Sequence, residues 1–86
     1  MKEIVWQPKA KRQLKKIKDQ RVKEGILDAV ETLVSFPNAR NVKALVKHKC
    51  THRLVIESYR VLFNAFDSIN IVSIEEVKKR NERTYR

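Results

Sequence analysis

The side chains that could do chemistry in this sequence are basic or aromatic, and most lie in its C-terminal half. They are Lys47, His48, Lys49, His52, Arg53, Arg60, Arg80, Arg83 and Tyr85. Such a set suits transesterification in RNA, in which the 2′-hydroxyl attacks the neighbouring phosphate. A base accepts the hydroxyl proton, cations stabilise the charge that develops, and a donor protonates the leaving oxygen. Arginine fits the second task because its planar guanidinium matches phosphate and stays charged, and tyrosine can stack on a base.

Arg60 is the most suggestive single residue of this set. It lies in the middle of an otherwise apolar run, Tyr59 to Phe63, which has the composition of a central β-strand. A charge in such a place is costly unless it is paired or opens onto a site. A salt bridge to Glu57 or Glu75 would explain it as well as a functional site would.

Other kinds of site find little support. His48, Cys50 and His52 alternate, so an extended chain would direct all three to one side, but structural zinc normally takes four ligands. We therefore predict no metal and no cofactor. The single glycine excludes a Gly-rich phosphate loop, and two histidines are too few to argue a Ser–His–Asp arrangement.

Charge points to a polyanionic partner. Twenty Lys and Arg against ten Asp and Glu give a formal net charge of +10, and the excess gathers in residues 9–18 and 78–86. Such a field attracts nucleic acid, although a basic surface for an acidic protein partner would have the same composition. The lone Cys50 suits a reducing compartment, and no apolar stretch resembles a signal peptide or a membrane span. We expect a cytoplasmic protein.

The pattern of apolar residues predicts an α+β fold with a single domain over residues 1–86. A short strand at Ile4–Trp6 precedes a helix that starts at Pro8, and a second helix runs from Val22 to Leu33 and stops before Pro37. The stretch from Asn38 to Thr51 has no firm period. Three β-prone segments then predict an antiparallel meander, at His52–Glu57, Tyr59–Phe66 and Ile69–Val77.

Alternation in the middle strand of this meander predicts its two faces. Tyr59, Val61 and Phe63 fall on one face, and Arg60, Leu62 and Asn64 fall on the other. The N-terminal strand is expected to join an edge of the sheet, and the helical hairpin to cover one face.

This order of elements resembles the RelE/ParE superfamily of toxins from type II toxin–antitoxin systems. The stretch Tyr59-Arg60-Val61-Leu62-Phe63 looks like the signature strand of that superfamily, and His52-Arg53-Leu54 fits the entry to its sheet. The tail from Val77 to Tyr85 resembles the end of the ribosome-dependent mRNA interferases, which close with a basic run and a tyrosine. The resemblance covers the whole chain and implies the RelE-like fold.

The resemblance also implies roles for particular residues. Arg60 and Arg80 match arginines that stabilise phosphate charge, Tyr85 matches a tyrosine that engages mRNA, and Arg53 matches a frequent basic position. Val55 stands where that branch often has a second basic residue, which leaves the proton acceptor open. The residues that could replace it as the proton acceptor are Lys47, His48, Lys49 and His52. The predicted RNA-binding residues are these four together with Lys78, Lys79 and Arg83.

Three functions follow as hypotheses. The first is a metal-independent endoribonuclease that cleaves mRNA in the decoding site of the 70S ribosome and is held inactive by an acidic antitoxin. The second is a ParE-like inhibitor of DNA gyrase, whose branch generally lacks the terminal arginine–tyrosine arrangement. The third is a non-catalytic module that binds RNA or the ribosome, in which Val55 reflects lost activity.

Overall fold

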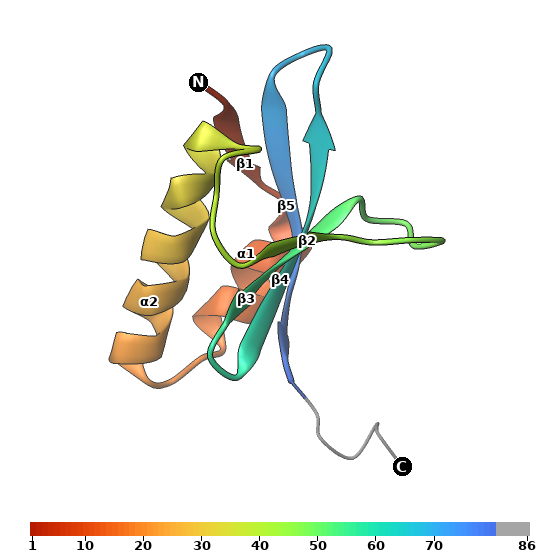
Figure 1. Cartoon of the computed structure of the whole chain (residues 1–86). Helices are drawn as coiled ribbons and strands as arrows, with labels where there is room; N and C mark the ends of the chain where they lie inside the picture. The colour runs from red at the N-terminus through yellow and green to blue at the C-terminus, as the bar shows by residue number, and fades with distance from the viewer. Residues whose placement is uncertain (81–86) are drawn as a thin grey trace.

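The computed structural model describes residues 1–80, which form helices on one side of a mixed β-sheet (Figure 1). The elements in chain order are β1 (Glu3–Trp6), α1 (Pro8–Lys15), α2 (Gln20–Glu31), the 3₁₀ helix η1 (Thr32–Ser35), β2 (Val42–Ala44), β3 (His52–Ile56), β4 (Tyr59–Phe66) and β5 (Ile71–Lys79).

Local sequence explains where both helices begin and where the second ends. Pro8 occupies the first turn of α1, where its missing N–H would have no partner in the helix. Asp19 caps α2, since its carboxylate accepts a hydrogen bond of 3.0 Å from the backbone N–H of Arg21. After α2, η1 leads into Phe36-Pro37, where a proline cannot continue a helix.

The strands of residues 1–80 form one five-stranded sheet in the order β1-β5-β4-β3-β2. The predicted meander is confirmed, because β3, β4 and β5 pair antiparallel in sequence order. The predicted N-terminal strand joins beside β5, in parallel. The fifth strand, β2, was not predicted. It has three residues, too few to show a pattern of alternation. It forms by antiparallel pairing with β3, in which Val42 lies opposite Leu54.

Beyond the end of β1, Gln7 and helix α1 provide hydrogen-bond partners for the edge of β5. Gln7 donates its backbone N–H to the Ile74 carbonyl at 2.9 Å, and the Gln13 side chain accepts from the Val77 N–H at 2.6 Å. These contacts satisfy backbone groups that β1 is too short to reach. They also place the basic helix α1 along the same strand that carries Lys78.

The two faces of the sheet differ as the alternation in β4 predicts. Val61 and Phe63 are fully buried against the helices, in a core that also contains Ile26, Leu33 and Ile74. The opposite face carries Arg53 of β3, Arg60 and Asn64 of β4, and Lys78 of β5, as their register shows. We call it the open face, because no helix of residues 1–80 packs on it (Figure 1). In this part of the chain no helix is both long and apolar enough for a membrane crossing.

Candidate anion-binding site

A pocket of about 200 Å³ on the open face brings basic residues from three strands together. It is lined by Leu45, His48, Arg53, Arg60, Leu62 and Lys78. Register explains the convergence: Arg60 lies opposite Lys78 of β5, and Arg53 lies opposite Leu62, two residues further along β4. Neighbouring strands lie about 5 Å apart, so side chains of one face meet over the gap between them.

The lining of this pocket contains no acid of the described residues, and one of its cations, Lys78, pairs with Glu76 beside the pocket. Arg53, Arg60 and Lys78 contribute, whereas no Asp or Glu of the described residues lines it. The Nε of Arg53 is buried and finds no hydrogen-bond acceptor among residues 1–80. A buried donor left without a partner costs about 1–3 kcal/mol. An anion in the pocket would supply an acceptor for this Nε–H, so the geometry fits a phosphate group.

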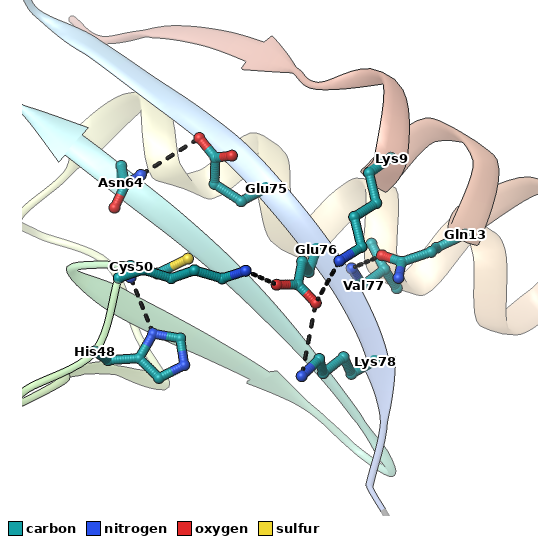
Figure 2. A network of polar contacts seen from close by, with 10 residues as sticks. Lys9, Gln13, His48, Cys50, Asn64, Glu75, Glu76, Val77 and Lys78 are labelled. Atoms are coloured by element: carbon teal, nitrogen blue, oxygen red, sulfur yellow. Dashed lines mark hydrogen bonds and ion pairs between the residues drawn. The ribbon is translucent and has the colours of Figure 1, made fainter.

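His48 lies at the rim of this pocket with one ring nitrogen already engaged. The backbone N–H of Cys50 donates to His48 Nδ1 at 2.9 Å (Figure 2). An acceptor nitrogen carries no proton, so the hydrogen-bonding pattern places the proton of the neutral ring on Nε2. In this arrangement the other ring nitrogen of His48, Nε2, is a hydrogen-bond donor, so the neutral ring is not placed to remove a proton.

Glu76 joins three lysines beside the pocket, and sequence reasoning missed it. It is 4% exposed, and its carboxylate lies 3.4 Å from Lys9 Nζ, 3.5 Å from Lys49 Nζ and 3.6 Å from Lys78 Nζ (Figure 2). Burial alone would raise the pKa of Glu76. The charges of Lys78 and Lys9, with hydrogen bonds from Lys9 and Lys49, outweigh burial and hold that pKa below its usual range.

A β-bulge explains how an acid reaches this position. Leu62 pairs with Glu76 but Phe63 pairs with Ile74, so Glu75 is an extra residue in β5. Figure 2 shows the Glu75 side chain turned toward Asn64 of β4, whose amide donates to it at 3.4 Å. The sequence signal was present, since two adjacent acids interrupt the apolar strand Ile71–Val77 in a strongly basic chain.

Comparison with known proteins identifies the family. The sequence model for the ParE toxin of the type II toxin–antitoxin system parDE matches residues 4–84, nearly the whole chain. The chain belongs to the ParE toxin family. The resemblance to the RelE/ParE superfamily is thereby confirmed. Among curated proteins, the sequence of this toxin has no significant match.

Solved structures confirm the RelE-like fold. The archaeal RelE–RelB complex from Pyrococcus horikoshii contains a chain that superposes with a TM-score of 0.80 at 16% identity, covering 94% of this toxin and 97% of that chain. The RelBE2 complex of Mycobacterium tuberculosis gives 0.77 at 22% identity, with 92% and 98% covered. The isolated RelE toxin of E. coli gives 0.77 at 16% identity, with 99% and 92% covered.

The structure separates His52 from the other basic residues of the toxin. His52 lies on the helix-covered face, where its ring stacks on Phe63 with centroids 5.5 Å apart and meets the edge of Phe36 at 4.8 Å. Burial lowers the pKa of His52, and the charge of Asp67 only partly opposes this. Its strand parity with Leu54 and Ile56 was the signal that placed it with the core.

The remaining predicted residues lie outside the pocket lining or outside the described residues. Lys47, Lys49 and Lys79 are exposed. Arg80 is exposed too, and its backbone N–H donates to the Ser58 carbonyl at 2.6 Å just past the end of β5. Arg83 and Tyr85 lie outside the described residues. The roles that the resemblance implies for Arg80 and Tyr85 therefore stay predictions, whereas Arg53, Arg60, Lys78 and His48 do share one pocket.

The acids, the histidines and the cysteine of residues 1–80 do not form a metal-binding geometry. No group of three or more of them is placed to hold an ion. His48 Nδ1 accepts from a backbone N–H, and His52 is packed between two phenylalanine rings on the other face. The alternating His48, Cys50 and His52 thus do not converge, because residues 46–51 form bends rather than a strand.

Proposed function

We propose that this toxin is a metal-independent endoribonuclease that cleaves mRNA on the ribosome. The observation that carries the proposal is the pocket on the open face, where Arg53, Arg60 and Lys78 surround a space without lining acids and the Nε of Arg53 is buried without an acceptor. A scissile phosphate would give that N–H its acceptor and place its developing charge among cations.

The chemistry needs only groups that the RNA and this pocket supply. The 2′-oxygen attacks the adjacent phosphorus, the bond from phosphorus to the 5′-oxygen breaks, and the products are a 2′,3′-cyclic phosphate and a 5′-hydroxyl. The 2′-hydroxyl proton passes to water, and water protonates the departing 5′-oxygen; His48, which lines the pocket, can donate a hydrogen bond through Nε2–H. Arg53 and Arg60 stabilise the phosphorane charge in between.

The size of the pocket favours action on RNA that is already held in place. A volume of about 200 Å³ accommodates a phosphate group but is small against the 300–1,000 Å³ typical of ligand sites. The in-line geometry must then come from a surface that fixes the RNA, as the decoding site of the cytoplasmic 70S ribosome would. The exposed lysines of α1 and a net charge of +10 suit contact with ribosomal RNA.

An antitoxin partner is the second part of the proposal. Two of the structural neighbours, from Pyrococcus horikoshii and Mycobacterium tuberculosis, were solved as toxin–antitoxin complexes. An acidic antitoxin would suit the basic surface of this toxin, and inactivation follows if its chain covers the open face.

The test is induction of the toxin with and without its neighbouring reading frame, with 5′ ends of mRNA mapped by primer extension. Wild type should arrest growth and leave cuts within codons. Arg60→Ala should lower cleavage by at least a hundred-fold, since removal of one charge-stabilising donor typically has this effect. Arg40→Ala is the matched control, because Arg40 is exposed and lies outside the pocket lining. Equal cleavage by a folded Arg60→Ala protein would refute the assignment.

Inhibition of DNA gyrase is the second candidate, and the match to the ParE family favours it. It predicts DNA breaks with intact mRNA on induction, and no effect of Arg60→Ala beyond that of Arg40→Ala. A third outcome, salt-sensitive RNA binding without cleavage of either nucleic acid, would mark the toxin as a non-catalytic RNA-binding module.

A further inference from the structure

The segment from Leu45 to Cys50 is an irregular loop between β2 and β3 that forms one wall of the pocket. Its base is closed by a hydrogen bond of 2.9 Å from the Leu45 N–H to the Thr51 carbonyl. Val46, near its tip, is 84% exposed, whereas Cys50 at its end is 2% exposed. Leu45 and His48 both line the pocket. We call residues 45–50 the wall segment.

One ion pair ties the wall segment to the sheet. Lys49 Nζ lies 3.5 Å from Glu76 Oε2, whereas Lys9 of α1 and Lys78 of β5 lie against Oε1. The two oxygens are thus divided between the wall segment and the rest of the fold. Among the salt bridges of residues 1–80, this is the one that involves the wall segment.

We propose that Glu76 is a positioning residue that holds the wall segment against the open face and thereby fixes His48 at the pocket. The carboxylate also contacts the pocket lining directly, because its other oxygen lies against Lys78, which lines the pocket with His48. The link to catalysis rests on the nuclease function proposed above, but the positioning itself does not.

The charge arrangement explains why a neutral side chain at position 76 would not hold the wall segment in place. Three ammonium groups from three parts of the chain converge on a single buried carboxylate. Without that negative charge they repel one another, and the wall segment is the part with the least regular structure to resist. Lys49 is free to leave, since its side chain is 74% exposed.

Cys50 gives a probe that does not depend on RNA cleavage. It is the single cysteine of the chain, it is buried at the end of the wall segment, and it borders a hollow of about 340 Å³ shared with Lys49 and Glu76. Its rate of reaction with a small thiol reagent such as 5,5′-dithiobis(2-nitrobenzoate) reports how often the wall segment lifts.

Two variants separate opening of the segment from electrostatic effects on the thiol. Burial raises the pKa of Cys50, Glu75 and Glu76 raise it further, and Lys49 and Lys78 lower it. Glu76→Gln therefore favours the reactive thiolate and Lys49→Gln disfavours it, yet both break the same tie. Both should speed labelling about five-fold, the factor expected when an ion pair of modest strength is lost. Lys9→Gln is the matched control, because it removes a lysine from Glu76 but leaves the wall segment tied, and its rate should stay within two-fold of wild type.

The outcome with Lys49→Gln decides the proposal, and it does so even if Glu76→Gln fails to fold. Faster labelling of a folded Lys49→Gln protein supports the tie. Labelling at or below the wild-type rate overturns it, whatever Glu76→Gln does. On programmed ribosomes, both variants should lower the cleavage rate at saturation. If Cys50 of Lys49→Gln is labelled fast but the wild-type protein cleaves no RNA, the positioning role of Glu76 is upheld and the proposed nuclease function is refuted.

Discussion

Replacement of Arg53 by methionine should stabilise the toxin and impair anion binding at the same time. The Nε of Arg53 is a buried donor without an acceptor among residues 1–80, and Arg60 and Lys78 line the same pocket. An unsatisfied donor costs about 1–3 kcal/mol, and methionine keeps most of the apolar stem while removing the guanidinium.

The lower end of that range gives the expected size of the effect. A gain of about 1 kcal/mol in the free energy of unfolding raises the melting temperature by roughly 4–8 °C in a domain of this size. Arg40→Met is the matched control, because Arg40 is exposed and its substitution should stay within about 0.5 kcal/mol of wild type.

Thermal unfolding with added sulfate or phosphate completes the assay. An anion present at about 100 times its dissociation constant stabilises the folded state by about 2.7 kcal/mol, and Arg53→Met should lose most of that increment. General salt effects are removed by comparison with Arg40→Met, which should respond as wild type does. If Arg53→Met melts below wild type, Arg53 is stabilising where it lies. The buried Nε of Arg53 would then not mark an anion-binding site.

Three further predictions concern the core and the response to acid. Phe63→Ala should cost about 3–5 kcal/mol, enough to unfold much of a small domain, because Phe63 is fully buried at the centre of the sheet. Burial lowers the pKa of His52, so as pH falls the unfolded chain binds a proton at this position before the folded protein does. The wild-type free energy of unfolding should therefore decrease as pH falls below 6.5. In urea titrations, the free energy of unfolding of His52→Phe should depend less on pH in that range. The pKa of Glu76 is lowered as well, so its contribution is present above about pH 4.5 and disappears as pH falls through the folded value; Glu76→Gln should lack that acid-dependent part, and equal slopes in the two proteins below pH 4.5 would contradict it.

The pattern of apolar residues predicted most of the fold, because each element carried its own period. Alternation in β4 separated Val61 and Phe63 from Arg60 and Leu62, and the structure places the first pair in the core. The meander of β3, β4 and β5 followed from short connections, which favour pairing of neighbours in sequence. The strand β2 was not predicted, because three residues are too few to show an alternating pattern.

The candidate site was predicted in its residue types more than in its geometry. Arg53 and Arg60 were expected and do share a pocket with Lys78 and His48. His52 was grouped with them by its chemistry, although its parity with Leu54 placed it on the other face. A residue type states what a side chain can do, whereas strand parity states which way it faces, and the second decides which residues meet.

The sequence alone therefore determined the two α-helices and every strand of the described residues except β2, which face of β4 is apolar, and that the molecule carries a large positive charge. Only the tertiary structure decided that β1 joins in parallel beside β5, that Glu76 draws Lys9, Lys49 and Lys78 together, and that the wall segment closes one side of the pocket. The physical reason is that periodicity is local, since it arises from the backbone repeat of one element. Contacts between residues 9, 49 and 76 depend instead on register, on a one-residue bulge and on the path of an irregular segment, none of which leaves a repeating trace in the chain.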